Sequence, residues 1–421
     1  MSTPSQERAV IVGGGVIGAA CAYYLAQLGR SVILLERGEF GAACSHGNCG
    51  LVCPSHALPL CGPGAVRETL RAMLRPGSAF GIAPRFDPGL WAWLLKFSRN
   101  CTREKMLAGA RARQTLLQSS RTLYEELVRD ELRDCEWTED GVLFVYKSPG
   151  AFEHYAATDQ LLRNEFGLAA KAIDSEDLLA MEPSLLPDVA GAWHYQTDAH
   201  LRPDRLMSGW KRALERLGVE IREHCDVLGF EPAASQRRLT RALTSGEPVE
   251  GETFLIAAGA WTPLLTRELG VRVPIQPGKG YSLTMPRPAN CPRYPMIFEE
   301  HRVAVTPWAS GYRIGSTMEF SGYDTRLNRR RMGLLKSGAK LYLHEPMAEP
   351  VLEEWYGFRP MSVDDLPIIG PTPRYENVIL AAGHGMVGVS MATATGRLAA
   401  ELATGAVPHI DPAPFSARRF G

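Results

Sequence analysis

Residues 9–36 read AVIVGGGVIGAACAYYLAQLGRSVILLE, and this stretch decides the fold. A short apolar run meets the glycine pattern Gly13-x-Gly15-x-x-Gly18, and a helical pattern follows it. A second apolar run then ends on Glu36, 18 residues after the last of these glycines. A strand, a glycine-rich turn, a helix and a second strand in this order predict the start of a Rossmann-like α/β unit, whose turn binds a dinucleotide.

Each glycine of the turn has its own physical task. Gly13 permits the tight turn, Gly15 lets backbone N–H groups approach the pyrophosphate, and Gly18 lets the helix pack closely against the strand. The first helical residues, Val16 and Ile17, add unpaired N–H groups and the positive end of the helix dipole. These residues are therefore predicted to bind the cofactor.

The acidic residue at the end of the second run indicates which dinucleotide binds. Glu36 lies close to the roughly 20-residue spacing at which a carboxylate reaches the ribose hydroxyls. Such a carboxylate favours a free 2′-hydroxyl, so FAD or NAD is preferred over NADP. Arg37 follows directly and is predicted to line the same site.

Insertion into a membrane is the alternative for this stretch. Residues 9–28 carry no charge and are long enough to span a bilayer. The glycines and the polar Gln27 weaken that alternative, and the preceding MSTPSQER is not the basic segment of a signal peptide. We therefore expect a cytoplasmic protein without a transmembrane segment.

The overall composition limits the partners of the chain. It has 421 residues, enough for two domains, with 46 basic and 46 acidic side chains. A net charge of zero argues against nucleic acid as a partner and against strong adhesion to anionic lipid. Weak peripheral docking on a membrane stays open.

The nine cysteines, an odd number, indicate a reduced compartment. Cys44, Cys49, Cys53 and Cys61 follow the spacing C-x4-C-x3-C-x7-C. Plant-type iron–sulfur proteins have C-x4-C-x2-C, which this cluster misses by one residue. We expect packing residues in a tight loop and no metal, and the role of the cluster stays open.

The remaining patterns predict two domains that share the chain. Residues 41–64 are loop-like, residues 88–134 are helical, and residues 271–320 alternate as antiparallel strands do. Residues 253–260 and 378–402 return to α/β character, and Ala258 and Gly259 are small enough to allow close approach of a cofactor. We therefore assign residues 1–90, 150–270 and 350–421 to a dinucleotide-binding domain, and residues 91–149 and 271–349 to a substrate-binding domain.

Four motifs carry a likeness to a known family. They are GGGVIG with its following Glu36, SHGNCGLVCPSHALPLCGPG, WYGFRPMSVDDLPIIG and AAGHGMVGVSMATATGRLAAEL. In this order they resemble the D-amino-acid oxidase and dehydrogenase family of flavoproteins, and within it the bacterial D-amino-acid and D-hydroxyproline dehydrogenases. The likeness covers residues 10–402, and it is not specific for substrate.

The resemblance implies fold, cofactor and reaction. The fold would be an α/β, Rossmann-like FAD-binding domain interleaved with an α+β substrate domain built on an antiparallel sheet, with FAD held noncovalently. The reaction would be oxidative deamination of a D-amino or D-imino acid such as cis-4-hydroxy-D-proline, by hydride transfer from Cα to flavin N5. Electrons would pass to a quinone or carrier, with the enzyme cytoplasmic or peripheral on the inner membrane. The alternative is an oxidase that uses oxygen and acts on glycine, sarcosine or D-amino acids.

The resemblance also assigns candidate substrate residues. Arg359 is the expected partner of the substrate carboxylate, because a guanidinium matches a carboxylate with two hydrogen bonds and stays charged when desolvated. Structural pairing of Arg359 with Asp364 or Asp365 is the alternative. His56 and Tyr281 are the weaker candidates, either to hydrogen-bond substrate or to take a proton from its ammonium group.

Further candidates surround the cofactor. The turn into the last helix is expected to aim backbone N–H groups and a helix dipole at the flavin pyrimidine ring; it comprises Gly383, His384, Gly385, Met386, Val387 and Gly388. Ser45, Asn48 and Gly50 are expected to touch FAD, and Val227 to meet the adenine. The family loop commonly reads Asn-Ala-Gly, whereas this chain has Cys49 at the middle position.

Overall fold

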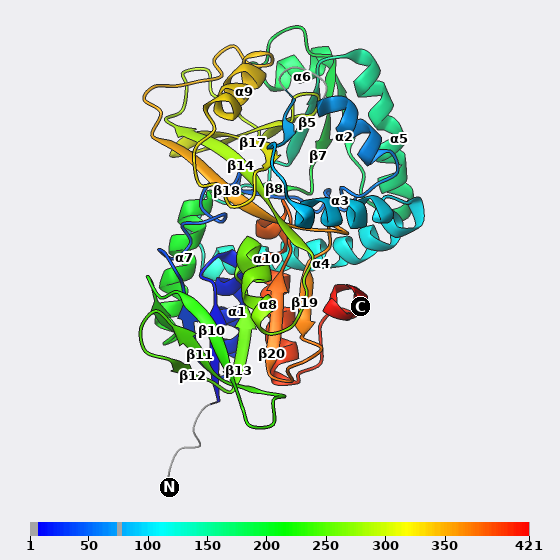
Figure 1. The fold of residues 1–421 in the computed structure, drawn as a ribbon. Helices are drawn as coiled ribbons and strands as arrows, with labels where there is room; N and C mark the ends of the chain where they lie inside the picture. The colour runs from blue at the N-terminus through cyan, green and yellow to red at the C-terminus, as the bar shows by residue number, and fades with distance from the viewer. Residues whose placement is uncertain (1–6, 74–77, 421) are drawn as a thin grey trace.

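The computed structural model describes residues 7–73 and 78–420 (Figure 1). Two large sheets dominate it, a six-stranded sheet in the lower half of Figure 1 and a nine-stranded sheet in the upper half. The chain passes between the two halves several times, so neither half is continuous in sequence. This mixed α/β architecture confirms the predicted fold class.

The six-stranded sheet contains β1 and β2, the two strands that flank the predicted dinucleotide-binding turn and helix. Its order is β19-β20-β13-β1-β2-β9, and all neighbours are parallel except β19 and β20. The strands are short and, apart from the edge strand β9, largely buried, as expected for parallel strands covered on both faces. Their bounds are β1 (Arg8–Val12), β2 (Ser31–Leu35), β9 (Glu220–Arg222), β13 (Thr253–Ile256), β19 (Ile368–Pro371) and β20 (Val378–Ala382).

Two helices with small residues cover this sheet. α1 (Val16–Gln27) packs against α10 (Gly388–Thr404), and both contribute to the largest apolar core. A Cβ on Gly396 would lie 2.5 Å from the backbone carbon of Ala20, so the crossing needs a glycine there. The charge-free stretch of residues 9–28 is therefore a strand and a buried helix. Among the helices of residues 7–73 and 78–420, none combines the length and apolarity that crossing a membrane requires.

The nine-stranded sheet has the order β18-β14-β17-β16-β15-β5-β7-β6, with β4 beside β17. Its pairs are antiparallel except β15 with β5 and β17 with β4. α9 (Arg329–Lys340), α5 (Pro149–Phe166) and α6 (Ser175–Met181) pack on it. The strand bounds are β4 (Phe80–Ile82), β5 (Val142–Tyr146), β6 (Lys171–Asp174), β7 (Gly191–Tyr195), β14 (Ile275–Met285), β15 (Met296–Phe298), β16 (Val303–Trp308), β17 (Gly311–Phe320) and β18 (Glu353–Ser362).

The sheets divide the chain differently from the predicted domain boundaries. The sequence patterns place residues 1–90, 150–270 and 350–421 in the dinucleotide-binding domain, yet β4, β6, β7 and β18 belong to the nine-stranded sheet. A strand pattern shows that a segment is extended but not which distant strand it will pair with. The structure therefore places these four strands in the nine-stranded sheet, and the division of the chain into a dinucleotide-binding and a substrate-binding domain stays a prediction.

The remaining elements connect and cap the two halves. The helical pattern over residues 88–134 is two helices, α3 (Pro88–Asn100) and α4 (Arg103–Asp130). The side chains of Asp87 and Thr102 cap their N-termini, which is why the pattern breaks between them. The other elements are α2 (Ala65–Met73), α7 (Pro203–Arg216), α8 (Thr262–Glu268), the sheet of β10 (Val227–Pro232), β11 (Leu239–Thr244) and β12 (Val249–Glu250), and the pair β3 (Leu51–Val52) and β8 (Ala199–His200).

Candidate active site

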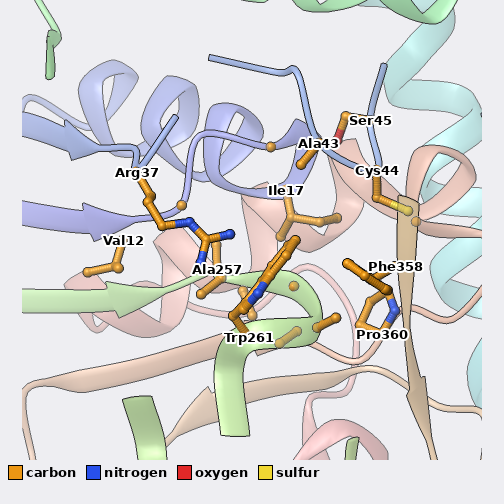
Figure 2. Close-up of a pocket in the computed structure, with 18 of the residues that line it drawn as sticks. Val12, Ile17, Arg37, Ala43, Cys44, Ser45, Ala257, Trp261, Phe358 and Pro360 are labelled. Atoms are coloured by element: carbon orange, nitrogen blue, oxygen red, sulfur yellow. The ribbon is translucent and has the colours of Figure 1, made fainter. Parts of the chain in front are cut away.

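A cavity of about 420 Å³ lies where the two halves meet. The carboxyl ends of β1, β2 and β13 and the N-terminal ends of α1 and α10 open onto it. Ligands of open α/β sheets bind at this edge, and the volume lies within the range of small-molecule sites. Figure 2 shows Ile17 of α1, Cys44 and Ser45 of the loop after β2, and Trp261 around the cavity.

The glycine turn divides into structural and cavity-facing residues. Gly13 has φ +111°, and a Cβ on it would lie 2.5 Å from the carbonyl oxygen of Ala257. A Cβ on Gly18 would lie 1.9 Å from the carbonyl oxygen of Gly13, so helix and strand touch here. Gly13 and Gly15 line the cavity, whereas Gly18 does not. Gly18 therefore acts through the close packing that the sequence motif predicts.

The N-terminus of α1 opens onto the cavity. Val16 and Ile17 both line it, and the Val16 N–H donates to Oγ of Ser45 at 2.9 Å. The first turn of any helix leaves N–H groups without intrahelical partners, and these groups attract phosphate. This hydrogen bond holds the loop after β2, which contains Ser45, against the first turn of α1.

The end of β2 places Glu36 and Arg37 at the cavity wall. The Glu36 carboxylate accepts from the N–H groups of Gly14 at 2.7 Å and Gly38 at 2.8 Å, which fixes its direction. The guanidinium carbon of Arg37 lies 4.5 Å from the ring centre of Trp261, a cation–π contact (Figure 2).

The loop after β2 contributes one further cavity residue and one structural residue. Asn48 lines the cavity, donates to the carbonyl oxygen of Ser45 at 2.8 Å and accepts from the Gly50 N–H at 2.8 Å. Gly50 does not line the cavity. Its φ is +70°, and a Cβ on it would lie 1.9 Å from the carbonyl oxygen of Leu201.

The other wall comes from β10 and the segment after β13. Val227, Ala258 and Gly259 line the cavity where the sequence predicts them. Trp261, Ala257 and Phe358 also line it, although sequence reasoning did not single them out. Trp261 directly follows the small residues at the end of β13, and Phe358 directly precedes Arg359. The same two sequence motifs could therefore have predicted both as cavity residues.

The turn into α10 reaches the cavity from a third side. His384, Gly385, Met386 and Gly388 line it. Gly383 does not line it, and Val387 packs into the apolar core. Burial lowers the pKa of His384 to about 3, and its Nε2 lies 3.0 Å from Oγ1 of Thr395. His384 is therefore neutral near pH 7.

Arg359 stands on β18 at the edge of this cavity. Asp364 is bound by Arg419 at 2.7 Å and Asp365 by Arg113 at 2.5 Å, so the alternative pairing of Arg359 with either aspartate is wrong. None of the ion pairs within residues 7–73 and 78–420 includes Arg359. Its guanidinium is a cation that can take a carboxylate.

One backbone contact orients this guanidinium. Nη1 of Arg359 donates to the carbonyl oxygen of Thr317 at 2.9 Å. Burial lowers the pKa of Arg359 from its usual value, although an arginine stays protonated near neutral pH.

The structure places Tyr281 and His56 away from the cavity. Gly278 pairs with Arg359, so Tyr281, three residues further along β14, points to the opposite face of the sheet. Its hydroxyl donates to Glu319 within the second apolar core. The His56 ring lies 5.6 Å from the Phe144 ring, tilted by 44°, and burial lowers the pKa of His56 to about 4.

The four loop cysteines lie in three different neighbourhoods. Cys44 lines the cavity, and Cys44 and Cys49 both lie close enough to Arg359 for its charge to lower their pKa, although burial raises it more. Cys53 lies with His56 and Asp198. The Cys61 thiol donates to the carbonyl oxygen of Asp364 at 3.2 Å.

Comparison with known proteins agrees with this architecture. The model of the family "FAD dependent oxidoreductase" matches residues 8–402. Proteins named D-amino acid dehydrogenase from Granulibacter bethesdensis and Chromohalobacter salexigens are each 32% identical, covering 98% of this chain and 99% of the relative. The crystal structure of glycine oxidase from Geobacillus kaustophilus has a TM-score of 0.77 at 23% identity, covering 98% of this chain and 99% of that one. The resemblance seen in the sequence is confirmed, and the chain belongs to the FAD-dependent oxidoreductase family.

Proposed function

We propose that this protein is an amino-acid dehydrogenase that oxidises the Cα–N bond of a D-amino or D-imino acid. The observation that carries the proposal is the guanidinium of Arg359, which borders the cofactor cavity and has no carboxylate partner among the described residues. The name D-amino acid dehydrogenase, which relatives of near-equal length carry, supports the same reaction. Cis-4-hydroxy-D-proline is our specific candidate substrate.

The residues around the cavity fit FAD. Backbone N–H groups at the start of α1 suit the pyrophosphate, and Glu36 suits a ribose hydroxyl. Val227 borders the far end, where the adenine would lie, and Ala258 and Gly259 allow a close approach. Burial raises the pKa of Cys44, so its thiol stays protonated and is a poor nucleophile. We therefore propose noncovalent attachment.

The chain supplies binding and electrostatics, while bound FAD supplies the hydride acceptor. Arg359 would hold the substrate carboxylate by two parallel hydrogen bonds. The N-terminus of α10 would stabilise negative charge that develops on the flavin ring. Neither Tyr281 nor His56 contacts this region, so we keep neither as a catalytic residue.

Anaerobic bleaching of the visible flavin band tests the proposal. We expect D-amino acids or cis-4-hydroxy-D-proline to reduce the flavin, and Arg359→Ala to weaken substrate binding by about 100-fold, because it removes a charge-assisted pair of hydrogen bonds. Arg359→Lys keeps the positive charge but loses the two parallel hydrogen-bond donors of the guanidinium. Its substrate affinity should therefore lie between those of wild type and Arg359→Ala. Bound FAD that no D- or L-amino acid bleaches would refute the proposed reaction.

The electron acceptor separates the two candidate enzyme classes. We propose a quinone or protein carrier, with an oxygen-using oxidase of glycine, sarcosine or D-amino acids as the alternative that the glycine oxidase fold favours. Reoxidation of the reduced enzyme in air, followed as peroxide, decides between them. Slow reoxidation by oxygen with fast reoxidation by a soluble quinone supports the dehydrogenase.

Peripheral attachment to the inner membrane is part of this proposal. α3 presents Trp91 and Leu95 to solvent, 58% and 53% exposed, and Phe86 just before it is 94% exposed. Lys96 and Arg99 are exposed on the same helix. Aromatic and basic residues together suit an anionic lipid surface. Trp91→Ala should reduce sedimentation of the holoenzyme with anionic vesicles, and equal sedimentation of both proteins would contradict this attachment.

A further inference from the structure

Two glycines lie opposite each other on the face of the nine-stranded sheet that carries Arg359. Gly357 of β18 lies directly opposite Gly280 of β14. A Cβ on Gly280 would lie 2.1 Å from Nη1 of Arg359. A Cβ on Gly357 would lie 2.1 Å from Cη2 of Trp355. The guanidinium therefore lies on one glycine of the pair, and the indole lies on the other.

This arrangement places an aromatic ring beside the carboxylate-binding group. Residues 355, 357 and 359 share one face of β18, because successive side chains of a strand alternate. Directly opposed positions of an antiparallel pair have Cβ atoms about 4.5–5.5 Å apart. The guanidinium and the indole are thus neighbours, and an amino acid held at Arg359 can direct its side chain onto Trp355.

The loop after β2 holds the indole in place. A Cβ on Gly47 would lie 2.0 Å from Cδ2 of Trp355, so the loop backbone touches the ring. Arg313 holds this loop by donating to the carbonyl oxygens of His46 at 2.7 Å and Asn48 at 2.8 Å. The indole is therefore a fixed wall.

The charged side chains next to Trp355 on this face already have partners. Glu353, the next acidic residue along β18, pairs with His46 at 2.7 Å and with the buried Arg313 at 3.5 Å. On the opposite side of the guanidinium, a Cβ on Gly278 would lie 2.9 Å from Cγ of Met361 and 3.0 Å from Sδ of Met318. A charged substrate side chain would lose its hydration here without gaining a partner.

We propose that Trp355 determines the substrate specificity of this site and selects an uncharged side chain with an apolar body, such as a branched chain or a saturated ring. An indole offers a large, rigid apolar surface for that body. This inference rests on the proposed function, because it takes Arg359 as the group that holds the carboxylate.

The test measures anaerobic flavin reduction, as rate over Kd, with D-proline, D-valine, D-alanine and D-lysine. We expect the wild-type holoenzyme to prefer D-proline or D-valine to D-lysine. In Trp355→Ala, the values for D-proline and D-valine should fall by about 10- to 100-fold, because an apolar wall of the pocket is removed, while D-alanine changes within about threefold. Gly357→Ala keeps the indole but displaces it, so the same order of effects is expected if Trp355→Ala does not fold.

The control is Val407→Ala, which shortens a side chain that is 88% exposed and does not line the cavity, so it should leave the preference unchanged. An equal fall for all four substrates, an unchanged preference in Trp355→Ala, or a wild-type preference for D-lysine would overturn the inference. Wild-type flavin that none of these acids reduces would instead refute the proposed function, so the two failures are distinguishable.

Discussion

The two ends of the cavity are built by different means. The nucleotide end uses backbone groups and small residues of one turn, in which Gly13 and Gly15 are near neighbours in sequence. The proposed substrate end uses the side chain of Arg359, which lines the cavity, and Trp355 stands beside it on the same face of β18; both side chains rest on glycines of paired strands. The first end is therefore encoded locally, whereas the second exists only once β14 and β18 have found their register.

Changing Gly18 should break the locally encoded end most severely. A Cβ in Gly18→Ala would lie 1.9 Å from a backbone oxygen, which cannot rotate away. We expect the free energy of unfolding to fall by more than about 3 kcal/mol, with loss of bound FAD. Chemical denaturation and the visible flavin spectrum measure both quantities.

Gly15→Ala is the matched variant for Gly18→Ala. Its Cβ would lie 3.2 Å from the Ser45 Oγ alone, and that side chain can move. The protein should fold with a stability within about 1 kcal/mol of wild type, yet bind FAD at least about 10-fold more weakly, because the methyl faces the cavity. An equal loss of stability in both variants would contradict the assignment of Gly18 to helix–strand packing and of Gly15 to the cavity wall.

Changing Gly280 tests the register-dependent end. The Cβ of Gly280→Ala would lie 2.1 Å from Nη1 of Arg359, at the far end of a flexible side chain. The protein should fold and hold FAD, while the substrate Kd rises by about 10- to 100-fold, because the displaced guanidinium no longer makes its full charge-assisted hydrogen bonds. Gly333→Ala on α9 is the control, because a Cβ there meets nothing within 4 Å. An unchanged Kd would mean that the guanidinium position does not matter for binding.

The same contrast explains how much of the site the sequence could predict. The turn from Gly13 to Gly18 and the end of β2 at Glu36 follow from spacing alone, since strand, turn and helix are consecutive. Ser45 and Asn48 also line the cavity as expected, although that expectation came from resemblance to a family.

Tyr281 shows where sequence reasoning fails. The alternating pattern around it predicts an antiparallel strand, which β14 is, but the face on which a strand residue lies depends on its pairing partners. Once Gly278 is opposite Arg359, Tyr281 must face the other side, toward Glu319. The sequence patterns also left open which sheet β4, β7 and β18 would join, because β4 pairs with β17, β7 with β5 and β18 with β14, all of them distant in sequence.

His384 stands at the junction of the two ends and gives the smallest predicted effect. It forms a bridge with Met361 of β18 while its neighbours line the cofactor cavity. Burial lowers its pKa from 6.5 to about 3, so below pH 6.5 the unfolded chain takes up a proton that the folded chain does not. The free energy of unfolding should therefore fall as the pH falls, by at most about 2 kcal/mol between pH 6.5 and 5.

Replacing the buried imidazole isolates this contribution. His384→Gln keeps a polar group near Thr395 but cannot titrate, so its stability should decline less steeply than that of wild type over this pH range. Parallel pH curves for wild type and His384→Gln would contradict this prediction, because they would show that the imidazole binds its proton equally well in the folded and in the unfolded chain, and that the junction does not bury it from water.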